Sequence, residues 1–190
     1  MANFTIVYDA CVLYPAGLRD LLIELARTGL FRAKWSARIQ QEWIDGLLRR
    51  RPELPRDRLE HVARLMEVAV PDCIVTGFEP LEAGLQGLPD PDDRHVLAAA
   101  IHAGAQEIVT MNLEDFPETV LRPYGISAVH PDEFVEHLLD LNAEVVCGCV
   151  RAIRARLTRP PHTAEQMLAK YEQQGLAVSA SILRGRIGSL

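Results

Sequence analysis

The segment LPDPDDRHVLAAAIHAG, residues 88–104, places three aspartates directly before an apolar run. Like charges about 4 Å apart repel by roughly 4 kcal/mol at an effective dielectric near 20, so this concentration needs a reason. Helix capping is one: Asp90 as N-cap, Pro91 as the first helical residue, and Asp92 and Asp93 favoured by the helix dipole. Binding of a hard cation, which prefers carboxylate oxygens, is the other.

Further acids follow apolar runs elsewhere in the chain. Asp9 ends the run NFTIVYD, and Asn112 and Asp115 follow the run EIVT. The carboxyl ends of parallel strands line one edge of a sheet, where ligands bind. We therefore expect Asp9, Asp93 and Asp115 to converge at that edge, which capping alone does not predict.

Apolar periodicity predicts the elements that position these residues. Strands are expected at 3–10, 31–36, 73–78, 107–112 and 126–130, and helices at 15–30, 36–51, 55–70, 94–104 and 131–142. This alternation predicts an α/β fold with a central parallel sheet of four or five strands flanked by helices. From residue 143 the pattern is purely helical, so we expect a domain over 1–142 and a C-terminal helical appendage over 143–190.

Composition excludes several classes of protein. Hydrophobic residues make up 48% of the 190 residues, which allows a packed core. No apolar run is long enough to span a bilayer and no charged segment precedes the first apolar run, so we expect a soluble, cytoplasmic protein with no membrane partner. The four cysteines (Cys11, Cys73, Cys147 and Cys149) lack a zinc-binding spacing and are expected to be free buried thiols.

Four motifs in order resemble those of the PIN-domain nucleases, most closely the VapC-like ribonuclease toxins of bacterial toxin–antitoxin pairs. They are IVYDA, QEW, DPDDRHVLAAA and IVTMNLEDF. The resemblance covers about residues 4–141 and implies a catalytic set made up of Asp9, Glu42, Asp93 and Asp115. It implies that these four, with Asp90, hold Mg²⁺ or Mn²⁺, while Thr110 and Asn112 orient ligands or substrate.

The chain departs from that family's pattern after the first aspartate. Many members carry Ser or Thr there, whereas this chain has Ala10 and then Cys11, so a supporting hydroxyl is lost. Asn112 stands where many relatives have a carboxylate. The four acids are nevertheless retained, so the resemblance implies a metal-dependent endoribonuclease that hydrolyses RNA phosphodiester bonds and is held in check by a cognate antitoxin.

Two other functional classes stay open at this point. A phosphoaspartyl enzyme or receiver could use Asp9, although the second aspartate or the lysine that such proteins need is missing. A non-catalytic PIN scaffold that binds RNA or a protein is the other. Residues 146–190 carry seven basic and two acidic side chains, +5 against −11 for the rest. This part is expected to bind RNA phosphates through Arg151 and Arg154, or to pack onto the core or a second subunit in a homodimer.

Overall fold

A five-stranded parallel sheet forms the centre of the molecule, as the sequence predicts. The computed structural model describes residues 4–190, so Asn3, in the first expected strand, lies outside the described residues. The strand order is β3-β2-β1-β4-β5, and every neighbouring pair is parallel. The strands are β1 (Thr5–Tyr8), β2 (Arg32–Ser36), β3 (Ile74–Val75), β4 (Glu107–Val109) and β5 (Ser127–Val129).

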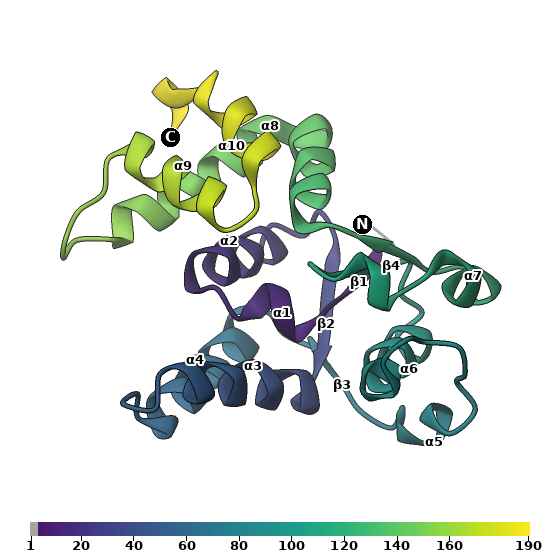
Figure 1. The fold of residues 1–190 in the computed structure, drawn as a ribbon. Helices are drawn as coiled ribbons and strands as arrows, with labels where there is room; N and C mark the ends of the chain where they lie inside the picture. Colours follow the sequence, from purple (N-terminus) through teal and green to yellow (C-terminus); the bar gives the residue numbers. More distant parts are fainter. Residues whose placement is uncertain (1–3) are drawn as a thin grey trace.

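Helices cover both faces of this sheet. Figure 1 shows α1–α4 on the left of the strands and α5–α7 on the right. The helices before the appendage are α1 (Ala10–Leu13), α2 (Ala16–Ala26), α3 (Ala37–Arg50), α4 (Arg56–Ala69), α5 (Glu79–Glu82), α6 (Arg94–His102) and α7 (Glu118–Leu121). The three short helices α1, α5 and α7 were not expected from the sequence. Short 3₁₀ turns at Pro91–Asp93, Leu113–Asp115 and Arg122–Tyr124 lie between them.

The expected starts of two helices are confirmed in detail. The Ser36 hydroxyl accepts a hydrogen bond of 3.1 Å from the Ile39 N–H and so caps α3. Thr163 and Gln166 form the reciprocal capping box at the start of α9. Trp35 and Trp43 are almost fully buried, which fixes β2 and α3 in the core.

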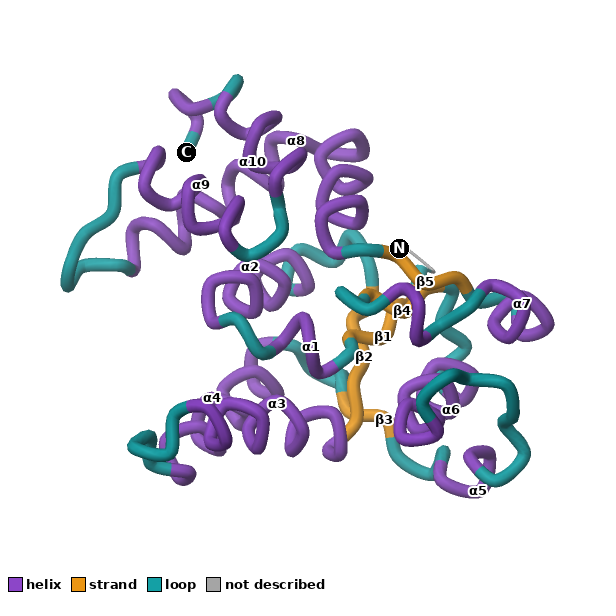
Figure 2. The backbone as a smooth tube through the Cα atoms, viewed as in Figure 1, coloured by secondary structure: helices purple, strands orange, loops and turns teal. Residues whose placement is uncertain are grey.

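The C-terminal helices form a separate group beside the sheet (Figure 2). They are α8 (Pro131–Arg156), α9 (Ala164–Gln173) and α10 (Ala177–Arg184), followed by a 3₁₀ turn at Ile187–Ser189. The first part of α8 ends at Asn142, as expected, because the backbone there is not helical (φ −159°, ψ 83°). A second helical part follows this kink and runs to Arg156. The Asn142 side-chain oxygen accepts a hydrogen bond of 3.1 Å from the Val145 N–H at its start, and Val146 and Val150 are fully buried.

A buried carboxylate fastens α10 to α8. Asp132, in the first turn of α8, accepts hydrogen bonds of 2.8 Å from the N–H groups of Val178 and Ser179 at the start of α10. Those N–H groups have no acceptor within their own helix, so Asp132 satisfies them from a neighbouring one.

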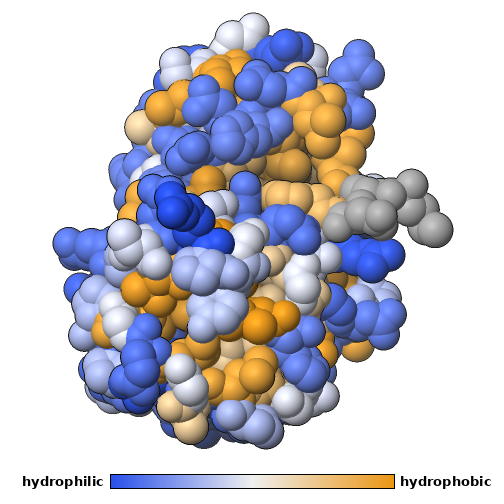
Figure 3. Space-filling model, turned by 90° about the vertical axis from the view of Figure 1, so that its right-hand side faces the viewer, coloured by the Kyte–Doolittle hydropathy of each residue, from blue (hydrophilic) through white to orange (hydrophobic). Residues whose placement is uncertain are grey.

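Figure 3 shows a face on which hydrophobic residues are interspersed with hydrophilic ones. The predicted homodimer stays a prediction.

The thiol and membrane expectations can be compared with the structure. All four cysteines are free, and three are buried, whereas Cys11 is only half-buried. None of the helices within residues 4–190 combines the length and the apolar character needed to cross a bilayer.

Candidate active site

Residues far apart in sequence meet at the carboxyl edge of the sheet. A pocket of about 680 Å³ is lined there by residues from β1, α3, the acidic turn and the segment after β4. It contains Asp9, Glu42, Asp93 and Asn112 from the predicted set. Asp9 follows β1 directly, and its N–H donates to the Val109 carbonyl oxygen at 3.1 Å, which ties the ends of β1 and β4 together.

Asp9 is held in place by two side chains. The buried Thr110 hydroxyl donates to Asp9 Oδ2 at 2.8 Å, and the Cys11 thiol donates to the same oxygen at 2.9 Å. Thr110 Oγ1 in turn accepts from the Asn112 N–H at 3.0 Å, so it also fixes the turn after β4. The Thr110 hydroxyl thus fixes the orientation of Asp9, and its role in supporting a bound ligand stays a prediction.

Cys11 is the residue that sequence reasoning missed. Its sulfur also accepts a hydrogen bond of 3.1 Å from the Met111 N–H, and burial together with the Asp9 charge raises the pKa of the thiol. A thiol that stays protonated is a hydrogen-bond donor. The hydroxyl expected to be lost beside Asp9 is therefore replaced by a thiol donor, and the position of Cys11 two residues after Asp9 was the available signal.

Asp93 lies among like charges. Burial and, in decreasing order, the negative charges of Asp9, Asp115 and Asp90 together raise its pKa from the ordinary 3.8 to about 7. Asp93 makes no side-chain capping hydrogen bond to α6. Its place at the N-terminus of that helix still lets the helix dipole stabilise its negative charge.

Asp90 does cap, as the alternative explanation predicts. Its Oδ1 accepts a hydrogen bond of 2.8 Å from the Asp92 N–H at the start of the 3₁₀ turn. Asp90 and Asp115 do not line the pocket itself. The buried Phe116 anchors the turn that carries Asp115.

Glu42 reaches the pocket from α3 and is oriented by two partners. One is His95, almost fully buried on α6, whose Nε2 lies 2.8 Å from Glu42 Oε1. The other is Arg38, 3.4 Å from the same oxygen. Arg38 also pairs with Glu82 at 3.2 Å, which joins α3 to α5. The contact of His95 with Glu42 was not predicted from the sequence, although its place two residues after Asp93 was a signal for it.

The carboxylates are oxygen ligands of the kind that a hard divalent cation prefers, but they are not arranged as a complete set of ligands for one. Within residues 4–190, no three Asp, Glu, His or Cys side chains are already arranged to hold a metal ion. Burial and the neighbouring negative charges raise the pKa of Asp93, and a bound Mg²⁺ or Mn²⁺ would stabilise the charged form of such oxygen donors. We conclude that the donor set fits such an ion.

Comparison with known protein families agrees with this fold and edge. Residues 5–114 match the family model described as PIN domain, which is more than half of the chain. The chain belongs to the PIN domain family. The match spans β1 to the turn after β4, and thus the PIN motifs that contain Asp9, Glu42 and Asp93.

The C-terminal part of this PIN protein matches a second model. Residues 131–185 match the VapC50 C-terminal domain, a range that begins with α8. The chain is 42% identical over 82 residues to a Mycobacterium tuberculosis protein named "Putative ribonuclease VapC50", over 43% of this chain and 48% of that protein. The chain thus spans about half the length of that relative. No solved structure gives a significant match.

Arg151 and Arg154, the predicted RNA contacts of the appendage, do not line the pocket of carboxylates. Arg151 Nε donates to the Ser189 carbonyl oxygen at 2.8 Å, and an Arg154 Nη donates to the Leu190 carbonyl oxygen at 2.9 Å. Both guanidinium groups thus hold the end of the chain against α8. That they bind RNA stays a prediction.

Proposed function

We propose that this chain is a metal-dependent endoribonuclease and the toxin of a toxin–antitoxin pair. The observation that carries the proposal is the cluster of Asp9, Glu42 and Asp93 at the carboxyl edge of a PIN fold, with the pKa of Asp93 raised by burial and by its acidic neighbours. The printed name of the relative, a ribonuclease, supports the same activity. The toxin role and the antitoxin partner rest on the resemblance, and a cytoplasmic location rests on the composition of the sequence.

The roles of the residues follow from their contacts. Asp9, Glu42 and Asp93 would hold Mg²⁺ or Mn²⁺, with Asp115 and Asp90 close enough to add negative charge. A bound divalent cation supplies Lewis acidity toward water and neutralises charge on a phosphodiester. Thr110 and Cys11 fix Asp9 Oδ2, and His95 and Arg38 fix Glu42, so the carboxylates keep their positions when substrate binds. We also propose that the nuclease unit ends near Asn142, where α8 kinks.

Cleavage of mixed RNA by the purified chain tests the activity, with Mn²⁺ or with EDTA. Asp9→Asn and Asp93→Asn should each lower cleavage by about 100-fold or more, because each removes a charge that stabilises the transition state. Asp57→Asn, an exposed acid in the first turn of α4, is the matched control and should cleave like the wild type. Full cleavage by Asp93→Asn, or cleavage that survives EDTA, would contradict the assignment.

Expression in bacteria tests the toxin role. The wild type should arrest growth, Asp9→Asn should not, and co-expression of the neighbouring gene product should relieve the arrest and co-purify. A folded, metal-loaded wild type that is harmless would contradict the toxin role. A protein that binds RNA without metal-dependent cleavage would instead be a non-catalytic PIN scaffold.

A further inference from the structure

Two hollows adjoin at the C-terminal end of α3. Besides its acids, the pocket described above is lined by Tyr14, Arg49 and Arg50. A second hollow is lined by Tyr14, Arg50 and Arg51 among others. Because Tyr14 and Arg50 line both, the surface continues from the acids to a region rich in arginine.

Arg49 and Arg50 are exposed, and within residues 4–190 neither side chain makes an ion pair or a hydrogen bond. Other arginines, such as Arg58, share this property, but they do not line the pocket of carboxylates. Nearby arginines are paired: Arg51 with Glu53 at 2.9 Å, and Arg56 with Asp45. Basic residues in the last turn of α3 are stabilised by the helix dipole. That effect does not require them to line a pocket of carboxylates.

Tyr14 presents an aromatic ring at the boundary of the two hollows. The ring packs against Gly46 of α3, where an added Cβ would lie 3.4 Å from Tyr14 Cδ2 and Cε2. Glycine therefore lets the ring lie close to the helix backbone. Tyr14 is half-buried, so the rest of the ring is accessible to a ligand.

We propose that Arg49, Arg50 and Tyr14 form a subsite for one nucleotide of single-stranded RNA, next to the phosphate that is cleaved. The two guanidinium groups bind the phosphate of this nucleotide, and the Tyr14 ring stacks on its base. This inference rests on the proposed nuclease function. It explains why cations share a pocket with carboxylates: a polyanion that approaches Asp9 and Asp93 needs its own positive contacts.

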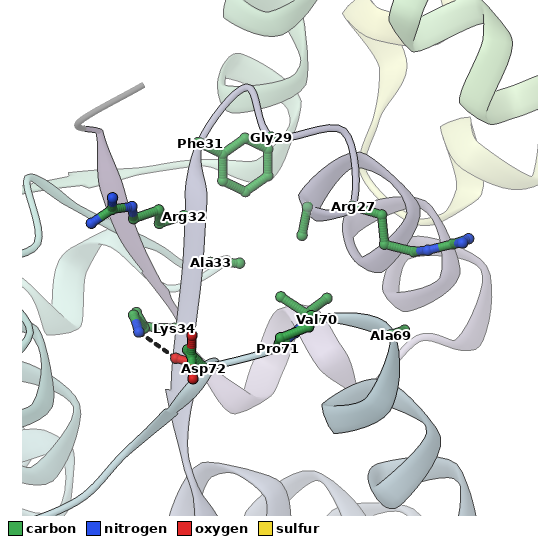
Figure 4. A pocket seen from close by; sticks show the side chains of 11 residues that line it. Arg27, Gly29, Phe31, Arg32, Ala33, Lys34, Ala69, Val70, Pro71 and Asp72 are labelled. Atoms are coloured by element: carbon green, nitrogen blue, oxygen red, sulfur yellow. Dashed lines mark hydrogen bonds between the residues drawn. The ribbon is translucent and has the colours of Figure 1, made fainter. Parts of the chain in front are cut away.

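Other basic regions are less suited to this role. Figure 4 shows a hollow lined by Arg27, Arg32 and Lys34, on the start of β2 and the neighbouring helices. There Lys34 donates to the Asp72 carbonyl oxygen, and Arg27 pairs with Glu24 at 3.0 Å. In Figure 4 the Arg32 side chain points away from the hollow.

Binding of a fluorescein-labelled single-stranded RNA octamer of mixed sequence, followed by anisotropy in EDTA, tests the subsite. Full-length Asp93→Asn protein is the reference, so that the RNA stays intact. Adding Arg49→Gln and Arg50→Gln should weaken binding about tenfold and reduce the slope of log K against log salt by about 0.7, which is the contribution of the one single-strand phosphate that both side chains bind. The double substitution Arg32→Gln and Arg64→Gln removes the same charge elsewhere and should change the RNA affinity and the salt slope much less.

The stacking contact is tested in the same background. Tyr14→Leu keeps an apolar side chain on Gly46 and should weaken binding about tenfold without changing the salt slope, whereas Tyr14→Phe should bind like the reference. Tyr124→Leu, at an exposed tyrosine, is the control. Melting temperatures near that of the reference show that each variant is folded.

The outcomes separate this subsite from the proposed function. Unmeasurable RNA binding by the reference, or arginine and Tyr14 variants that bind like their controls, would overturn the subsite. If the wild type cleaves RNA with Mn²⁺ in that case, the nuclease function stands without it. If the variants weaken binding as expected but the wild type cleaves no RNA, the subsite stands and the nuclease function fails.

Discussion

Removing the charge of Asp93 should stabilise the protein without metal. The pKa of Asp93 is raised from 3.8 to about 7 by burial and by the charges of Asp9, Asp115 and Asp90. At about 1.36 kcal/mol per pH unit this corresponds to about 4 kcal/mol. Because the carboxyl is only half-buried, solvent screening reduces it, and we expect about 2 kcal/mol. For a chain of this size, Asp93→Asn should then raise Tm by about 4 to 8 °C at pH 8.

The pH dependence has a defined sign. Between pH 3.8 and about 7 the unfolded chain loses the Asp93 proton while the folded protein keeps it, so the wild type loses stability relative to the variant as pH rises. The Tm difference should vanish as pH approaches 4 and reach its full value above about pH 7. Calorimetry of both proteins from pH 4 to pH 8 in EDTA measures it.

Metal should reverse the order of stability. At 100 times its Kd, Mn²⁺ should stabilise the wild type by about 2.7 kcal/mol and the Asp93→Asn protein much less. Asp57→Asn, at the start of α4, is the control for a helix-dipole effect and should be neutral or slightly destabilising. If Asp93→Asn behaves like this control at pH 8, or gains as much from Mn²⁺ as the wild type, the like-charge explanation is wrong.

Three further substitutions test contacts that hold the site and the appendage. Thr110→Val removes the buried donor to Asp9 and should lower the free energy of unfolding by about 1 to 3 kcal/mol in urea titration, with weaker Mn²⁺ binding by calorimetry. His95→Leu should weaken Mn²⁺ binding by freeing Glu42, while His95→Gln, which keeps a donor near the Nε2 position, should restore it; equal loss in both would show a packing role only. Asp132→Ala should cost about 2 kcal/mol and speed amide hydrogen exchange in α10 first, and unchanged exchange there would refute its role as a cap.

Much of the architecture follows from local patterns that the sequence displays directly. Alternating β-branched runs and amphipathic helices predict a parallel sheet, because parallel strands need helical crossovers. Ser36 and Thr163 mark helix starts through bonds to residues three positions away, which are local. The order of Asp9, Glu42, Asp93 and Asp115 along such a pattern also predicts a shared edge, which the structure shows for the first three.

Tertiary structure alone decided the rest. The sequence predicts helices on both sides of Asn142, but the helices on which α8 buries its apolar side chains, α2 and α10, are distant segments that periodicity near Asn142 does not reveal. The Cys11 thiol became a donor to Asp9, and His95 a partner of Glu42, through the placement of α1 and α6 beside the strand ends. Residue type gives the chemistry that a side chain can perform, but only packing over long sequence distances determines which partner it meets.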